Sequence, residues 1–154
     1  MLAIVLTAAA EALSAPALPG FVVGFNKAAG GSSIVEQVPQ GETVHDWTRM
    51  VTTQRFAGLA ARTGGDGFLS LMLGGLQRGC PAARVTYRRP VGSAAQMRVD
   101  CPLNPATGKP ETFFAKAMPG KPDMHVAQVA FRRVPTPADV KWAEAHLAKV
   151  ALKP

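Results

Sequence analysis

Short apolar runs separated by glycine and proline dominate the chain after residue 20, and this punctuation is the feature that most constrains its fold. Antiparallel strands joined by tight turns give such a pattern, because glycine and proline end strands and favour turns. We therefore predict three strands in the first part of the domain and four in the second. Their ranges are 21–26, 34–38, 47–56, 84–89, 96–101, 111–118 and 125–133.

Two segments have the period of a helix instead. Apolar residues recur at helical spacing over residues 66–78, which predicts the first helix. The second is predicted to begin at Pro137, because Thr136 is a good N-cap and Asp139 complements the helix dipole in the first turn. The order of elements predicts an α+β domain: an antiparallel sheet of about six to seven strands with two helices packed on one side.

The first twenty residues are typical of an export signal. Residues 2–10 form an apolar run without charge, followed by small residues in the small-x-small pattern of a cleavage site. No basic residue precedes the run, and a buried N-terminal helix is the alternative interpretation. The run is too short to cross a bilayer. We predict a signal peptide over 1–19, a single domain over 20–154, and a periplasmic or secreted protein without a transmembrane segment.

Cys80 and Cys101 are the two cysteines of the chain. An even count in an exported protein predicts a disulfide between them, closing a loop of about 20 residues. The sequence has no Cys-x-x-Cys spacing of a redox-active pair. The histidines, at positions 45, 125 and 146, lack the spacing of metal ligands. We therefore predict no metal site and no other cofactor.

A formal net charge of +7 should draw the protein to anions. Arginines concentrate in the predicted strands of the second half, where outward positions on one face would form a set of guanidinium forks for phosphate or carboxylate groups. The predicted anion-binding residues are Arg84, Arg88, Arg89, Arg98, Arg132 and Arg133. A solvated basic surface without a ligand is the alternative.

The expected partner of this basic face is an anionic envelope component or an acidic protein. Nucleic acid is not expected, because stacking aromatic side chains usually accompany the basic groups. Simple alternation over residues 84–89 turns Tyr87 away from the outward arginines. A cytosolic nucleic-acid binder would also have to retain residues 1–20. The sequence leaves the oligomeric state open.

Two strings in the first half carry a resemblance to known proteins: EQVPQGET at residues 36–43 and WTRMVTTQ at residues 47–54. Together they resemble a signature of uncharacterised small exported proteins of proteobacteria, which also carry two later cysteines. That resemblance implies no activity. The order of strands and helices is similar to the fold of the photosystem PsbP and Mog1 proteins, which implies a binding or assembly role rather than catalysis.

Catalytic motifs are sparse. The sequence contains neither the Gly-x-Ser-x-Gly elbow of a serine hydrolase nor a P-loop. His45 beside Asp46 is the one candidate base, yet adjacent residues of an extended strand point to opposite faces. We assign no catalytic residue and predict a noncatalytic exported binding or assembly module of the cell envelope. The alternative is a small envelope hydrolase that uses His45 with Asp46 or Glu42.

Overall fold

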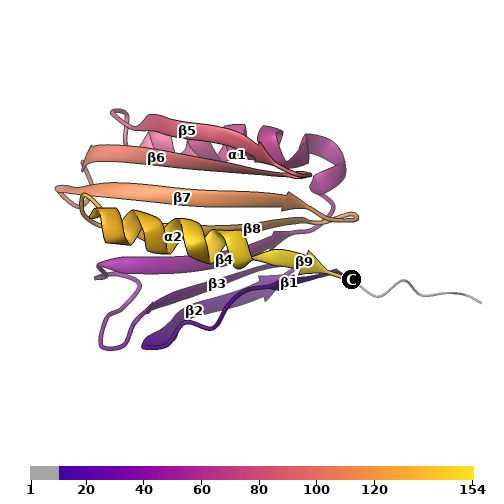
Figure 1. The fold of residues 1–154 in the computed structure, drawn as a ribbon, viewed down its shortest axis with the longest axis horizontal. Helices are drawn as coiled ribbons and strands as arrows, with labels where there is room; N and C mark the ends of the chain where they lie inside the picture. The colour runs from indigo at the N-terminus through magenta and orange to yellow at the C-terminus, as the bar shows by residue number, and fades with distance from the viewer. Residues whose placement is uncertain (1–10) are drawn as a thin grey trace, which may run out of the picture.

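The computed structural model describes residues 11–154, which form a seven-stranded antiparallel sheet in the order β2-β3-β4-β8-β7-β6-β5 and a two-stranded sheet, β1-β9 (Figure 1). The large sheet contains β2 (Phe21–Ala29), β3 (Ser32–Pro39), β4 (Arg49–Phe56), β5 (Arg84–Val91), β6 (Ala94–Asn104), β7 (Lys109–Pro119) and β8 (Met124–Phe131). The remaining elements are β1 (Ala12–Ser14), α1 (Ala60–Gly79), α2 (Pro137–Lys149) and β9 (Ala151–Lys153).

The predicted α+β class, the seven strands and the two helices are confirmed. Helix α1 begins at Ala60 rather than at residue 66, and a kink at Gly64, whose φ is 61°, interrupts it. The residues before the kink do not continue the spacing of apolar residues that predicts the rest of the helix, because a residue with positive φ interrupts the regular helical turn. The next residue, Gly65, lies against the sheet, where a Cβ would come within 3.1 Å of the Ala117 carbonyl oxygen.

The helices lie on opposite faces of the sheet, and not on one side as predicted (Figure 1). Strand β7 runs through the middle of the molecule and is buried on both faces. Its residues Ala115 and Ala117 join the core beneath α1, whereas Phe114 and Met118 join the core beneath α2. Because side chains alternate along a strand, each helix covers its own set of residues on this strand.

Helix α2 is fixed at both ends. Thr136 is the N-cap, as the sequence predicts, and it forms a capping box with Asp139. At its end, the buried Lys116 ammonium donates to the Leu147 and Val150 carbonyl oxygens, at 3.1 and 2.7 Å. These carbonyls carry the negative end of the helix dipole. Burial lowers the pKa of Lys116 below its ordinary value.

The predicted signal peptide is only partly within the described structure. Residues 1–10 lie outside the described residues. Strand β1 pairs antiparallel with β9, with Leu13 opposite Leu152, and Leu13 and Leu18 pack against the core beneath α2. The domain boundary expected at residue 20 therefore falls between β1 and β2. Among the described residues, no helix has the length and apolar character needed to span a membrane.

Cys80 and Cys101 form a disulfide, as predicted. Their Cα atoms are 6.2 Å apart, and both residues are buried in the core beneath α1. Cys80 directly follows α1, and Cys101 lies in β6. The bond therefore ties the exit of α1 to the sheet that the helix covers.

Candidate functional site

Strand β5 has a β-bulge at Thr86, where its register with β6 shifts between Val85 and Tyr87. A bulge adds one residue to one strand, so side chains on its two sides no longer follow a simple alternation. Beyond the bulge, Tyr87 lies opposite Arg98. Tyr87 packs against the core beneath α2, and the Arg98 guanidinium lies over the Phe114 ring of that core. Both residues are therefore on the α2 face of the sheet.

The bulge brings three of the six predicted arginines onto this face. Arg84 lies opposite Asp100 in the sheet. The Asp100 carboxylate accepts a hydrogen bond from Arg98, so Arg84 is on the same face as Arg98. The Arg89 guanidinium carbon lies 4.7 Å from the centre of the Tyr87 ring. We call the four residues Arg84, Tyr87, Arg89 and Arg98 the arginine strip. Its tyrosine is on the arginine face, contrary to the alternation expected from the sequence.

Only one arginine of the strip has a carboxylate partner. Arg98 pairs with Asp100 at 2.9 Å, and the hydroxyls of Thr86 and Thr112 also donate to this carboxylate. Burial alone would raise the pKa of Asp100, but these hydrogen bonds hold it below its ordinary value. Arg84 and Arg89 are exposed and form no salt bridge with residues 11–154. Their charges are available to an external anion.

Arg88 and Arg132 lie apart from the strip. Arg88 turns to the opposite face and binds Asp66 of α1 at 2.6 Å. Arg132 pairs with the buried Glu111 at 3.0 Å. An arginine that already binds a carboxylate of the same chain has less of its charge available to an outside ligand, so these two residues are not counted in the strip.

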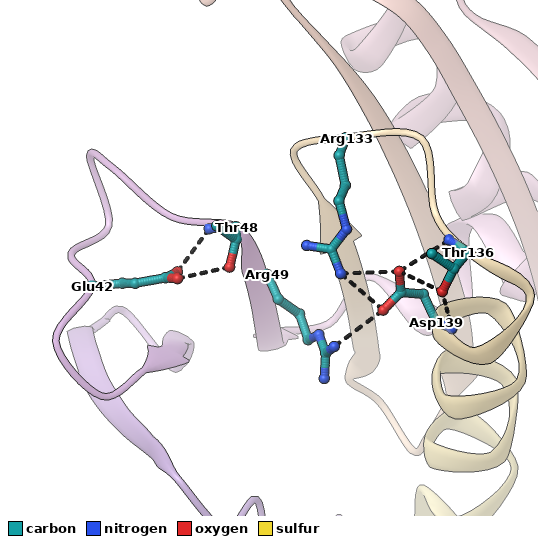
Figure 2. Close-up of polar contacts among 6 residues, drawn as sticks. All are labelled: Glu42, Thr48, Arg49, Arg133, Thr136 and Asp139. Atoms are coloured by element: carbon teal, nitrogen blue, oxygen red, sulfur yellow. Dashed lines mark hydrogen bonds and ion pairs between the residues drawn. The ribbon is translucent and has the colours of Figure 1, made fainter.

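Arg133 belongs to a second cluster, at the start of α2 (Figure 2). Its guanidinium and that of Arg49 converge on the buried Asp139 carboxylate, at 2.9 and 3.1 Å. Thr136 donates to the same carboxylate from its backbone N–H and its hydroxyl. Burial would raise the pKa of Asp139, but the hydrogen bonds from Thr136 and Arg133 outweigh this effect and lower it. The cluster fixes the start of α2 to β4 and to the segment that follows β8.

The candidate catalytic residues lie in the loop between β3 and β4. His45 and Asp46 are exposed, and the carbonyl of His45 accepts from Arg132 at 3.0 Å. The Glu42 carboxylate is occupied by the backbone N–H and hydroxyl of Thr48, each at 2.7 Å (Figure 2). Glu42 therefore closes this loop, and these contacts lend no support to a hydrolase built on His45.

Sequence reasoning missed a cavity of about 250 Å³ between α2 and residues 16–19. Its walls include Arg49, Trp142, His146 and Lys149. Trp142, His146 and Lys149 are four and three residues apart, and this spacing could have indicated that they share one face of α2. No local signal could place Arg49 beside them, because that contact depends on how α2 lies over β4.

Comparisons with known proteins show a similar fold but identify no family. No protein-family model and no curated protein matches the chain. Among solved structures, it is similar to the 1.9 Å crystal structure of the Ran-binding protein Mog1p from Saccharomyces cerevisiae. The TM-score is 0.54 at 10% sequence identity, over 89% of this chain and 82% of that one. At this identity the likeness shows the fold alone, as the order of strands and helices predicts.

Proposed function

We propose that this protein is an exported, noncatalytic binding module and that the arginine strip is its contact with an anionic component of the cell envelope. One observation carries the proposal: the bulge at Thr86 places Arg84 and Arg89, both exposed, on the same face of the sheet as Arg98. Neither of the two forms a salt bridge with residues 11–154. The description of Mog1p as a Ran-binding protein supports a binding role by analogy of fold.

The spacing of the strip favours an extended anionic surface over one small anion. Arg84 and Arg89 are five residues apart on β5, and a strand rises about 3.3 Å per residue, so their backbones are separated by roughly 15 Å. To bind a single phosphate group together, the two side chains would have to extend toward each other along the strand. Adjacent headgroups of an anionic phospholipid surface can contact both guanidinium groups, and the net charge of +7 attracts the protein to such a surface.

Replacement of both free arginines, in Arg84→Gln/Arg89→Gln, is expected to weaken binding to vesicles that contain phosphatidylglycerol by about 30-fold. The reason is that each arginine near an anionic surface contributes about 1 kcal/mol. The measurement is cosedimentation with vesicles at an ionic strength of about 0.15 M, where the Debye length is about 8 Å, with pure phosphatidylcholine vesicles as the uncharged reference.

The matched control is Arg62→Gln/Arg78→Gln, which removes the same charge from exposed positions of α1 on the opposite face. We expect less than a threefold change in vesicle binding, since the attraction between the membrane and charges on the far face of the protein is largely screened by salt. Equal losses in the two double variants would show that net charge alone drives binding. Absence of any vesicle binding would contradict the proposed partner.

Export is supported by the apolar leader and by the disulfide, because disulfides persist in oxidising compartments. We further propose that the leader is removed upstream of Glu11, so that β1 stays with the mature domain. The Glu11 carboxylate accepts the Lys121 backbone N–H at 2.8 Å, and β1 pairs with β9. Ala8 and Ala10 supply small residues at the positions that such a cut requires.

A chain that begins at Gly20 is expected to be less stable than one that begins at Glu11, by about 1–2 kcal/mol. The shorter chain loses β1 and the half-buried side chains of Leu13 and Leu18, whose partial burial accounts for this amount. Urea unfolding of the two truncated proteins measures the difference. Equal stability would instead allow the cut at residue 19 that the sequence suggests.

A further inference from the structure

One residue that lines the cavity between α2 and residues 16–19 has an unsatisfied polar atom. His146 is 6% exposed, and its Nε2 has no hydrogen-bond partner among the described residues. Its imidazole stacks on the Trp142 ring, with the ring centres 5.6 Å apart. A buried ring nitrogen without a partner is costly, because it has lost its hydrogen bond to water. His146 lines the cavity, so a ligand group that reaches this nitrogen after a small movement of the ring would satisfy it.

The other polar groups of the cavity are cationic. Arg49 uses one nitrogen for Asp139, and its guanidinium carbon lies 4.4 Å from the Trp142 ring centre. Lys149 extends from the last turn of α2. No carboxylate is among the described residues that line the cavity. Burial, and then the charge of Lys149, lowers the pKa of His146, so its ring is neutral near pH 7 and can donate through Nε2–H.

We propose that this cavity binds a small organic carboxylate. The anionic head accepts hydrogen bonds from His146 Nε2 and from the Arg49 and Lys149 side chains. The apolar body lies against the wall that residues 16–19 and Phe21 form. Charge-assisted hydrogen bonds to a carboxylate are the strongest that these donors can make. The site is on the flank of α2 away from the arginine strip and needs none of its residues.

The volume sets the size of the ligand. Pockets for drug-sized ligands measure about 300–1,000 Å³, and this cavity measures about 250 Å³. A compact body of one ring or a short branched chain is the largest that fits. Benzoate is therefore a suitable probe, and benzamide is its neutral counterpart with nearly the same shape.

The test titrates the full chain with sodium benzoate while the Trp142 indole and His146 ring signals are followed by NMR. Benzoate is expected to perturb both signals saturably and to raise the pKa of His146, since a bound anion stabilises the imidazolium ion. Benzamide is expected to bind at least tenfold more weakly. His146→Phe, which keeps an aromatic ring next to Trp142, should weaken benzoate binding about tenfold.

A second pair of variants keeps the test decisive even if His146→Phe does not fold. Lys149→Gln should weaken benzoate binding about fivefold. Lys141→Gln, also exposed on α2 but outside the cavity lining, should leave it unchanged. Equal binding of benzamide, equal effects of the two lysine variants, or no saturable shift would each overturn the proposal. Arg84→Gln/Arg89→Gln should bind benzoate normally, so the carboxylate site and the arginine strip can fail independently.

Discussion

Reduction of the Cys80–Cys101 disulfide is expected to lower the free energy of unfolding by about 3 kcal/mol. The two cysteines are 21 residues apart in the sequence, and a cross-link of that span restricts the unfolded chain more than the folded one. Both residues are also buried beneath α1. Guanidinium unfolding at pH 7, with and without a phosphine reductant, measures the change.

The control for reductant effects is the Cys80→Ala/Cys101→Ala variant. Its unfolding midpoint should not change with the reductant and should be equal to or lower than the midpoint of the reduced protein. An unchanged midpoint on complete reduction would contradict the structural role of the bond. If the loss is as large as expected, the protein gains much of its stability only in an oxidising compartment.

The Asp139→Asn variant is expected to lose about 2–3 kcal/mol of stability at pH 7. The substitution removes the charge on which Arg49 and Arg133 converge, in a side chain that is only 8% exposed. Breaking a buried ion pair by removing one partner typically costs about 3–5 kcal/mol. We expect less because both guanidinium groups retain contact with water. Thermal or urea unfolding gives the value.

The pH dependence of this loss is a second test of the same site. Because the pKa of Asp139 is lower in the folded protein than in the unfolded chain, its stabilising contribution is present above the ordinary value near 3.8. It is lost as the pH falls through the folded-state value. The difference between wild type and Asp139→Asn should therefore be largest at neutral pH and shrink below pH 4.

Asp66→Asn is the matched control for Asp139→Asn. Asp66 also pairs with an arginine, at 2.6 Å, but its side chain is 74% exposed. Exposed ion pairs contribute little to stability, so this variant should lose less than about 1 kcal/mol. A loss equal to that of Asp139→Asn would mean that burial does not set the strength of these pairs.

The seven strands of the large sheet and the start of α2 could be predicted because each depends on local signals, whereas β1, β9 and the first turns of α1 were not predicted. Alternating apolar residues and the glycine and proline turns mark the strands, and the Thr136 cap marks the start of α2. The helix faces could not be assigned in this way. The pertinent signal was present in β7, where residues 113–118 are almost all apolar; a strand of this kind is buried on both sides and indicates cover on both faces.

The arginine strip could be predicted only in part. Arg84, Arg89 and Arg98 were recognised from composition and alternation, but their common face depends on a bulge that nothing in the local sequence marks. The bulge also moved Tyr87 to the arginine face and left Arg88 on the other. The cavity at His146 depends on contacts among α2, β4 and residues 16–19, which are distant in sequence and close only in the folded chain.

If the arginine strip contacts an anionic envelope surface, such a surface should leave a footprint on β5 and β6 of the whole protein. Amide hydrogen exchange would be measured with and without phosphatidylglycerol nanodiscs. We expect added protection in β5 (Arg84–Val91) and its neighbour β6, with α1 unchanged. Protection centred on α1, with β5 and β6 unchanged, would contradict it.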